Sequence, residues 1–417
     1  MKLKLIIALL LSQLGFSQQT TCGTDAYMQQ KMSDPVAKQR YLDLQNKFEI
    51  ELAKIENQQN KSPTNTNATL LIPVAVHFPS VATNSTDKTC LMQLAQTQID
   101  VLNADFNATN SDAALWTPSV SALYPGTNVG NLNIQFVIAT QNHPAGTGLA
   151  NGQKAVTFGT NFLNNNSIDT QWKYYLNIVV RASPNSLGNS PYGGDPKFGE
   201  SVVLNYDAFG TGAGCTGYVP SGFNGLGRTA THEVGHYFKL AHVFADNGIC
   251  DAANTDNVAD TPQCIASGGV SCPAIGSVAG CVAGEKSLTM NYMNYTNDVC
   301  KFMFTAGQVT RMRAYYDTTL YNQFATNVLA SENFEFTNFK LYPNPNLGTF
   351  KISFTPENND EVKISIFDYS GRNVYNKSYQ NTILFDQELQ LDTIASGVYF
   401  INIQNGASKM VKKIIVE

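Results

Sequence analysis

The residues with the clearest chemical potential lie in one short window, HEVGHYFKLAH, over residues 232–242. This window holds three of the five histidines in the 417-residue chain. On a helix, His232 and His236 are four residues apart and project from one face, where both imidazoles can bind one metal ion. His242 lies too far along to share that face, so the chain must turn to bring it round. Three nitrogen ligands with one open position are typical of a catalytic zinc (Zn²⁺) site.

Glu233 directly follows the first of these histidines, where a general base for a zinc-bound water is needed. Zinc lowers the pKa of its bound water toward ~7, and a carboxylate can take that proton and pass it to the leaving amine. This pattern predicts a metalloendopeptidase that acts on protein or peptide substrates. The alternative is a secreted surface adhesin that keeps the metal site for structure, but the complete ligand set with a base beside it favours the enzyme. His77 and His143 are isolated, so we interpret both as structural histidines.

Charge and composition exclude several other classes of protein. The chain has 27 Lys and Arg against 32 Asp and Glu, a net charge of −5, and no basic run. Nucleic acids and anionic membranes therefore have no electrostatic support as partners. Lys2 and Lys4, an apolar run over 5–11 and Ser17 predict a cleavable signal peptide over residues 1–17. No segment is long and apolar enough for a transmembrane span. The signal peptide predicts a secreted protein.

The elements that must position the site follow from the hydrophobic pattern, which divides the chain into parts. Residues 18–65 contain one amphipathic helix that starts at Asp34-Pro35 and a polar stretch over 57–66, and we interpret them as a separate N-terminal piece, a propeptide. Residues 66–325 mix apolar strands with two long helices and predict an α/β domain. A linker over 326–337 precedes a small all-β sandwich over 338–417. We expect strands at 70–78, 134–139, 175–180, 201–206, 349–354, 361–367, 373–379, 397–403 and 410–416, and helices at 91–106 and 305–316.

The window and its surroundings resemble the metzincin zinc endopeptidases, and within them the ulilysin-like branch of the pappalysin family. The supporting segments are Gly227–Thr231, Val258–Pro262 and Asn291–Tyr295, and the resemblance covers roughly residues 70–320. It implies a metzincin-like catalytic domain with a twisted sheet, an active-site helix and a loop-rich C-terminal subdomain. It also implies that Met293 forms the Met turn beneath the zinc, and that Tyr295 is a switchable ligand whose hydroxyl stabilises the transition state. Without the family, core packing explains both residues.

One residue departs from the metzincin pattern. Metzincins usually carry Gly three residues after the second histidine, where the helix ends, and this chain has Lys239. A left-handed backbone conformation costs a non-Gly residue about 1 kcal/mol or somewhat more. Lys239 therefore calls the geometry of the turn into question, although it leaves the ligand set intact.

Cys22-Gly23-Thr24 resembles the cysteine switch of this family's propeptides. In such a switch a thiolate occupies the open position of the zinc and displaces the catalytic water, which makes the protein a latent zymogen. The alternative is a disulfide between Cys22 and Cys90.

Asp298 matches an acidic position that, in ulilysin-like enzymes, lies in the pocket just after the scissile bond. A carboxylate there implies a preference for Arg or Lys at that position of the substrate. The alternative is an ordinary exposed aspartate in a loop.

Five of the eight cysteines lie between residues 250 and 300, in a loop-rich stretch that disulfides would stabilise. A Cys₄ zinc site is the alternative, but no pair has C-x₂-C spacing. The resemblance implies the disulfides Cys250–Cys281 and Cys272–Cys300, with Cys264–Cys215 as a candidate third. Carboxylates in the same loops suggest a structural calcium (Ca²⁺) ion, although their spacing is irregular; they are Asp251, Asp256 and Asp260.

The C-terminal segment, with LYPNPNLGTF, GVYFINI and Lys412–Glu417, resembles a type IX secretion sorting domain. The resemblance implies that the type IX secretion machinery is a partner and that the protein is secreted, with attachment to the outer cell surface as one outcome. A carbohydrate- or protein-binding sandwich is the alternative. It would need an exposed row of aromatic residues, whereas most aromatics here alternate as core residues do.

Overall fold

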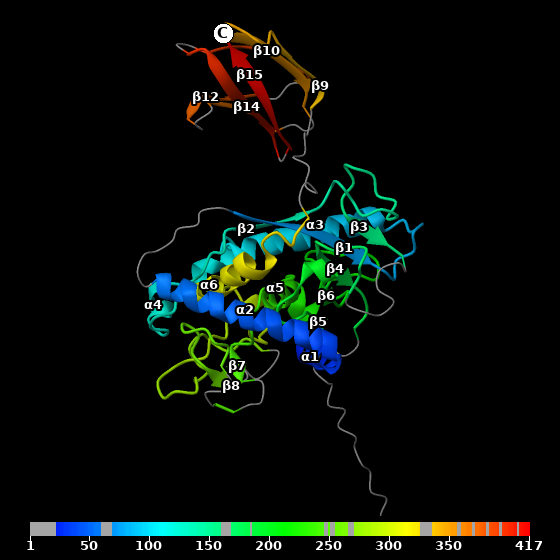
Figure 1. Ribbon diagram of the computed structural model, residues 1–417. Helices are drawn as coiled ribbons and strands as arrows, with labels where there is room; N and C mark the ends of the chain where they lie inside the picture. The colour runs from blue at the N-terminus through cyan, green and yellow to red at the C-terminus, as the bar shows by residue number, and fades with distance from the viewer. Residues whose placement is uncertain are drawn as a thin grey trace, which may run out of the picture. The chain divides into compact units, whose positions relative to one another are not determined.

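The computed structural model describes residues 22–417 apart from 60–68, 160–167, 184–185, 246–248, 251–254, 266–270, 326–335, 357–359, 369–371, 381–382, 392–393 and 407. The predicted signal peptide over 1–17 lies outside the described residues. The chain divides into two compact units, residues 1–329 and 330–417 (Figure 1).

A six-stranded sheet organises the first unit, in the order β2-β1-β4-β6-β5 with β3 also paired to β1. All pairings are parallel except that of β5 with β6. The central strands are continuous apolar runs because both faces of a parallel sheet are buried. Four of these strands match the predicted ones, whereas β3 and β5 are short and lacked a sequence signal. The strands are β1 (Leu70–Phe78), β2 (Ile134–Ile138), β3 (Val156–Phe158), β4 (Leu176–Val180), β5 (Gly188–Asn189) and β6 (Ser201–Leu204), with a separate pair β7 (Phe244–Ala245) and β8 (Cys264–Ile265).

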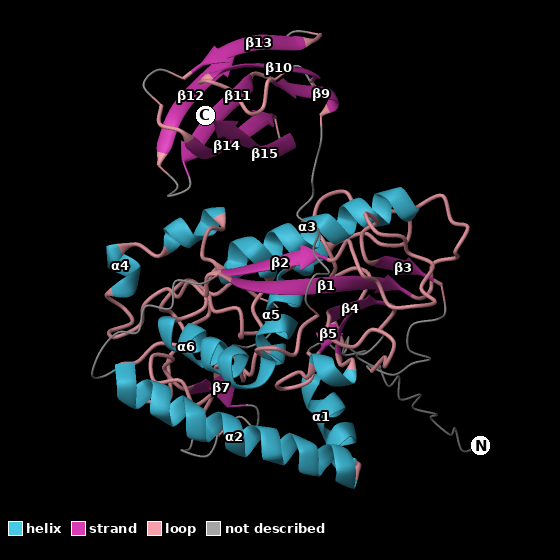
Figure 2. Ribbon diagram, turned by 45° about the horizontal axis from the view of Figure 1, so that its top comes forward, coloured by secondary structure: helices cyan, strands magenta, loops and turns pink. Residues whose placement is uncertain are grey.

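Two helices of the first unit, α3 and α5, pack on each other and on this sheet (Figure 2). The helix α5 carries the histidine window and is buried at every position. A buried helix at this position agrees with the one that the resemblance implied. The helices of this unit are α1 (Thr24–Ser33), α2 (Pro35–Gln59), α3 (Lys88–Phe106), α4 (Pro118–Ser121), α5 (Arg228–Tyr237) and α6 (Ala306–Tyr315), with shorter turns η1 (Ser111–Leu115), η2 (Pro196–Phe198), η3 (Gly222–Asn224), η4 (Asp298–Cys300) and η5 (Tyr316–Leu320).

The N-terminal segment is not a separate piece, as its sequence suggested. Helix α2 packs against α6 and η5 (Figure 1), and Phe48 and Leu52 are buried in the same core as the central sheet. The segment also contains α1, a helix that hydrophobic periodicity did not predict. The reason is that α1 has little amphipathic character and is held by contacts with the rest of the unit.

The second unit is an all-β sandwich with its own apolar core, as predicted. Its sheets are β13-β10-β9 and β12-β11-β14-β15, and every pairing is antiparallel. Two of the strands, β9 and β13, were missed by sequence analysis because their alternation of apolar and polar residues is weak. The strands are β9 (Thr337–Tyr342), β10 (Thr349–Thr355), β11 (Val362–Asp368), β12 (Asn373–Tyr379), β13 (Phe385–Gln390), β14 (Gly397–Asn405) and β15 (Ser408–Val416).

Three disulfides connect parts of the first unit. The structure contains Cys250–Cys281 and Cys272–Cys300, the two pairings that the resemblance implied. The third is Cys90–Cys215, which contradicts both the candidate Cys264–Cys215 pair and the alternative in which Cys22 is bonded to Cys90. Cys264 is a buried free thiol that donates to the carbonyl of Val243 and accepts from the hydroxyl of Ser287, while Cys215 is bonded to Cys90. Within the described residues, no helix has the length and apolar character needed to cross a membrane.

Candidate metal centre

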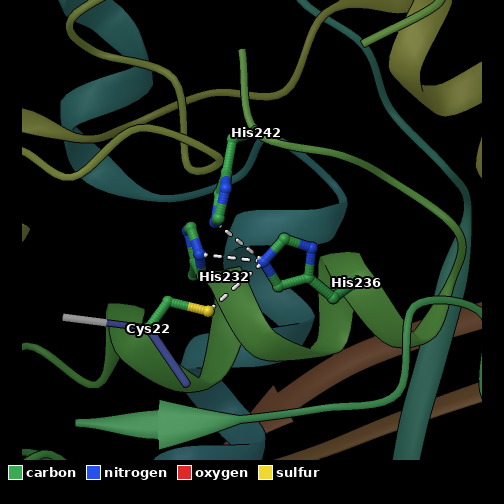
Figure 3. Close-up of side chains that lie close together, drawn as sticks. All are labelled: Cys22, His232, His236 and His242. Atoms are coloured by element: carbon green, nitrogen blue, oxygen red, sulfur yellow. Dashed lines mark hydrogen bonds between the residues drawn. The ribbon is translucent and has the colours of Figure 1, made fainter. Parts of the chain in front are cut away.

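The three histidines of the window meet at one point (Figure 3). The Nε2 atom of His236 lies 3.1 Å from Nε2 of His232 and 3.1 Å from Nε2 of His242. His232 and His236 share a face of α5, and the chain then turns at Lys239, whose φ of +74° is left-handed. This turn brings His242 back to the helix, so Lys239 adopts the conformation for which metzincins normally use Gly.

The hydrogen bonds of the imidazoles suit them to hold a cation. Nδ1 of His232 lies 2.7 Å from the carbonyl oxygen of Tyr292, and Nδ1 of His236 lies 2.7 Å from that of Leu240. Because a carbonyl oxygen only accepts, each Nδ1 donates and each Nε2 presents a lone pair to the common centre. Burial and the neighbouring histidines lower the pKa values of His232 and His236, so both rings are neutral.

The spacing of these nitrogens is consistent with a metal ion. Ligand nitrogens about 2.0–2.1 Å from a tetrahedral zinc are about 3.3 Å apart, close to the separations in this site. Three lone pairs that face one another repel unless a cation lies between them. The residues therefore fit a bound divalent metal.

Cys22 lies at the same centre, although 210 residues separate it from the window. Its Sγ atom is 3.5 Å from Nε2 of His236, and the four ligand atoms all lie within 4.8 Å of one another (Figure 3). The backbone N–H of Gly23 donates to the carbonyl of Gly188 on β5 at 2.7 Å, which fixes the segment on the edge strand of the sheet. Among the residues that the structure describes, this is the one cluster of three or more potential metal ligands.

Glu233 is fully buried beside this cluster. Its Oε2 atom accepts a hydrogen bond from the hydroxyl of Thr24 at 3.1 Å. Burial raises the pKa of Glu233 to about 8, although hydrogen bonds from Cys22 and Thr24 oppose the shift. The segment that places Cys22 at the histidines therefore also covers this carboxylate. Sequence analysis did not single out Thr24, because only the fold brings it to Glu233.

Met293 and Tyr295 both lie against the histidine cluster. Met293 is fully buried beneath α5, where a Cβ atom added to Gly235 would lie 2.5 Å from its Sδ atom. Only glycine therefore fits at position 235, which lies between the two helical ligands. The ring of Tyr295 lies 4.7 Å from that of His242 and 5.8 Å from that of His232. Met293 therefore packs against α5 between its two histidines, and Tyr295 lies beside the rings of His232 and His242.

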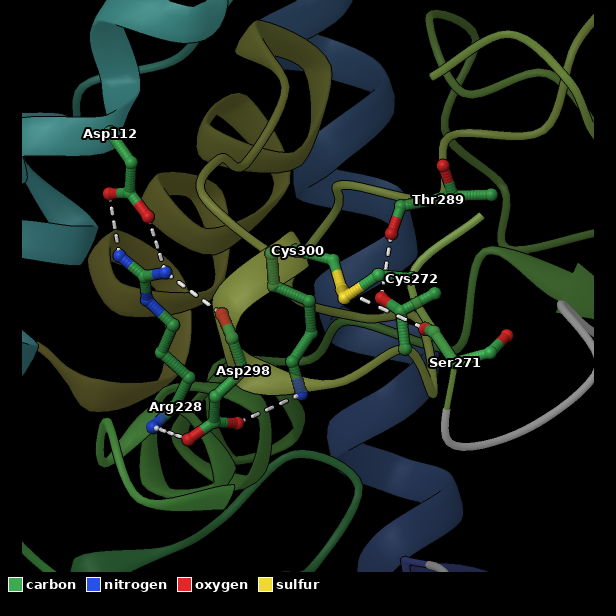
Figure 4. The surroundings of a disulfide bond; sticks show 9 residues. Asp112, Arg228, Ser271, Cys272, Thr289, Asp298 and Cys300 are labelled. Atoms are coloured by element: carbon green, nitrogen blue, oxygen red, sulfur yellow. Dashed lines mark hydrogen bonds and ion pairs between the residues drawn. A yellow bond between two sulfur atoms is a disulfide. The ribbon is translucent and has the colours of Figure 1, made fainter. Parts of the chain in front are cut away.

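Asp298 is fully buried, so it is not an exposed loop aspartate. Its Oδ2 atom accepts hydrogen bonds from the backbone N–H groups of Leu226 and Arg228, both at 3.1 Å (Figure 4). Its Oδ1 atom lies 3.6 Å from Nζ of Lys301, which is also buried. This carboxylate therefore anchors the start of α5 and already has a cation beside it.

Two carboxylates suggested as calcium ligands make hydrogen bonds with protein donors instead. Asp256 accepts from the hydroxyl of Thr261, and Asp260 accepts from the hydroxyl of Thr305 and the N–H of Gly307 at the start of α6. Asp251 lies outside the described residues. Nothing in these contacts indicates a cation, and calcium stays a prediction.

A buried network that sequence analysis missed holds the first ligand in place. Asp105 on α3 accepts hydrogen bonds from the hydroxyls of Tyr292 at 2.7 Å and Thr231 at 2.8 Å. Tyr292 in turn offers the carbonyl that orients His232. Arg228 lies 3.6 Å from Asp105 and forms a bidentate pair with Asp112 (Figure 4). Asp105 gave no signal because an acidic residue near the end of a helix is ordinarily exposed.

Comparison with known proteins identifies this arrangement. The family model described as pregnancy-associated plasma protein-A matches residues 221–317, which include the whole histidine window. The structure of a promirolysin mutant from Tannerella forsythia has a TM-score of 0.53 and 28% identity, covering 74% of this chain and 98% of that one. The histidine window therefore lies in a domain of the pappalysin family of metalloproteases.

Curated relatives match the chain over about 100 residues. An extracellular metalloprotease of Arthroderma benhamiae is 45% identical over 102 residues, which are 23% of this chain and 35% of that protein. One of Sordaria macrospora is 46% identical over 103 residues, or 24% of this chain and 32% of that protein. The chain thus matches about a third of the length of these relatives. A secretion system C-terminal sorting domain matches residues 340–417, so the predicted sorting domain is confirmed and indicates secretion.

Proposed function

We propose that this protein is a zinc endopeptidase that is made as a latent zymogen. The observation that carries the proposal is the convergence of three imidazole Nε2 atoms beside a buried glutamate. Neutral imidazoles suit zinc, and a site with three protein ligands leaves a fourth position for water or substrate. His232, His236 and His242 would hold the ion.

The chemistry follows from what each side chain can do. A zinc ion, when bound, lowers the pKa of a coordinated water and polarises the scissile carbonyl. Glu233 accepts the proton of the attacking water at its carboxylate and delivers it to the leaving amine. Tyr295 lines the site and can donate its hydroxyl hydrogen to the negative oxygen of the transition state. Met293 and Asp105 position the histidines.

Latency follows from the position of the N-terminal segment. The Cys22 thiol lies where a fourth ligand would bind, and the hydroxyl of Thr24 donates a hydrogen bond to the carboxylate of Glu233. Together they leave neither an open metal position nor a free general base. We propose that residues 18–65 are a propeptide and that its removal activates the enzyme.

Substrate preference is proposed at Asp298, which would favour Arg or Lys just after the scissile bond. The matching acidic position in ulilysin-like enzymes supports this role. The buried ammonium group of Lys301 weakens the attraction of Asp298 for a basic side chain, because it already compensates part of the negative charge. The C-terminal sandwich would engage the type IX secretion machinery and can leave the enzyme attached to the cell surface.

The decisive experiment compares the processed protein with its Glu233→Gln variant on a peptide library, with and without a zinc chelator. We expect chelator-sensitive cleavage that falls about 10²–10⁴-fold in the variant, the usual contribution of a general base. Zinc content is measured in both proteins, because the variant should keep its metal. Glu285→Gln, an exposed site, is the matched control. A processed protein that binds zinc but cleaves nothing would favour the adhesin.

Sequencing the new N-termini in the same digest tests Asp298. Arg or Lys at these termini is the expected result, and Asp298→Asn should remove the preference. Cleavage without such a preference would keep the protease and discard this pocket.

A further inference from the structure

The N-terminal segment also covers an acidic site outside the histidine cluster. Glu200, directly before β6, is fully buried. Its Oε2 atom accepts a hydrogen bond from the N–H of Asp195 at 3.0 Å. Its Oε1 atom lies 2.5 Å from Nζ of Lys31 and 3.4 Å from Nη2 of Arg40. We infer that Glu200 is a binding subsite for a basic side chain of a peptide substrate, a site that the propeptide occupies in the latent form.

Both cations on Glu200 come from the segment that processing would remove. Lys31 is the third residue from the end of α1. Arg40 lies in the first two turns of α2, where its guanidinium also stacks 3.7 Å from the ring centre of Phe198. When both leave, the Oε1 side of Glu200 loses its counter-ions and its cover together. A carboxylate in so recessed a place binds a new cation more strongly than an exposed one does.

Among the described residues, the ion pairs of Glu200 are those with Lys31 and Arg40, and the neighbouring Asp195 adds negative charge. The carboxyl group of Asp195 lies close enough that Glu200 contributes to raising its pKa, after burial. Phe198 offers an aromatic face on which a guanidinium already rests. The site therefore suits Lys or Arg, with the aromatic face as an additional contact for Arg.

The path of α1 links this subsite to the proposed catalytic centre. At the start of α1, the hydroxyl of Thr24 donates to Glu233. In the middle of the helix, the sulfur of Met28 accepts a hydrogen bond from the N–H of Tyr192. Near its end, Lys31 forms the ion pair with Glu200. Lys31 lies seven positions after Thr24 on α1, which corresponds to a rise of about 10 Å at ~1.5 Å per residue. An extended peptide spans about 10 Å in three residues, at ~3.3 Å each. We therefore expect the basic residue three or four positions from the scissile bond, separate from the residue that meets Asp298.

This inference rests on the proposed function, because it assumes that a peptide enters the space left by α1. The test uses the full chain cleaved between residues 60 and 68 and separated from its N-terminal fragment. A peptide series carries one Lys at each position on both sides of a cleaved bond, with norleucine as the uncharged reference. We expect Lys at one position, three or four residues from that bond, to raise kcat/KM about tenfold at low salt and less at high salt. Glu200→Gln should abolish that gain, whereas Glu285→Gln should keep it.

Two outcomes would overturn the inference: no position with a lysine gain at that distance, or an equal gain in Glu200→Gln. The comparison of lysine with norleucine uses the unaltered protein, so it holds even if the variant does not fold. If nothing is cleaved, the proposed function is wrong, and binding of a peptide with the sequence of residues 22–45 decides the subsite. Replacing its Lys31 and Arg40 by norleucine should weaken binding at least about tenfold. Equal binding of the two peptides would reject the Glu200 site independently of any activity.

Discussion

Cys22 shows how a single side chain can govern the whole site. It lies 3.5 Å from His236, and its neighbour Thr24 covers Glu233. We therefore predict that Cys22→Ala in the full chain loses latency, so that processing in the 60–68 region becomes several-fold faster than in the wild type. Gel analysis of the fragments over time measures the rate. Cys264→Ser, at the other free cysteine among the described residues, is the matched control and should stay latent. Equal processing rates would reject the cysteine switch.

Lys239 has a role that its departure from the family pattern did not suggest. Its side chain is buried, and Nζ donates to the hydroxyl of Tyr41 on α2 at 2.9 Å and lies 3.7 Å from the ring centre of Tyr192. The left-handed backbone costs about 1 kcal/mol or somewhat more, and in return the side chain of Lys239 holds α2 of the N-terminal segment.

We accordingly predict that Lys239→Gly releases the propeptide several-fold faster than the wild type, although it relieves the strained φ. Size-exclusion chromatography of the cleaved but unseparated protein measures the release. Lys239→Met keeps most of the side-chain volume without the charge and should resemble the glycine variant. If Lys239→Met instead retained the propeptide as the wild type does, volume and not charge would explain the contact.

His77, one of the two isolated histidines, affects acid stability. Its ring is fully buried, with Nδ1 2.7 Å from the hydroxyl of Thr157 and Nε2 3.2 Å from Oδ1 of Asn177. Burial lowers the pKa of His77 from 6.5 to about 3. Between these values the unfolded chain takes up a proton that the folded protein does not, so folding weakens by about 1.4 kcal/mol per pH unit as the pH falls.

We predict that His77→Gln flattens this dependence between pH 6 and pH 4, even if it is less stable at pH 7. Denaturant unfolding of both proteins at several pH values gives the difference, in which contributions from other titrating groups cancel. Parallel curves for the two proteins would show that His77 is not the group responsible.

At the scale of elements, Asp105 connects three parts of the site: α3, α5 and the Met turn. Its carboxylate accepts hydrogen bonds from the hydroxyls of Thr231 on α5 and of Tyr292. The backbone carbonyl of Tyr292 in turn orients His232. Burial raises the pKa of Asp105 to about 6, against the opposing effect of Arg228. A buried network of this kind is costly to break because it leaves polar groups without partners.

Asp105→Ala should therefore lower the free energy of unfolding by about 2–4 kcal/mol and weaken zinc binding. Asp105→Asn keeps an acceptor for one of the two hydroxyls and should lose less of both. Chemical denaturation and zinc competition with a chromogenic chelator measure the two effects. A variant that lost stability but bound zinc normally would show that Asp105 supports only the fold.

At the scale of the whole molecule, the two compact units have separate cores. The second unit buries its own apolar residues, among them Phe350, Ile364 and Ile401, in a cluster that includes none from the first. A segment with its own core and boundary is expected to fold as a unit. Removing residues 330–417 should leave hydrolysis and the melting temperature of the first unit unchanged while secretion is lost. Calorimetry of the full and shortened chains checks this, and a lowered melting temperature of the first unit would contradict it.

Local pattern was enough to predict much of this protein. Apolar runs predicted β1 and β4, spacing predicted α5 with its histidines, and the resemblance supplied Met293 and two disulfides. These features depend on residues that are near neighbours in sequence, or on motifs whose geometry is shared across a family. Weaker local signals failed: α1 has little amphipathicity, and β3 and β5 are too short to show a period.

Only the tertiary structure could show which distant residues share a space. The sequence predicted the three histidines as metal ligands, but not that Thr24 covers Glu233, that Lys31 and Arg40 pair with Glu200, or that Cys90 is bonded to Cys215. Each of these contacts joins residues more than 100 positions apart. Periodicity reports which face of an element is buried, whereas the partner of a buried charge or thiol depends on how the chain closes on itself.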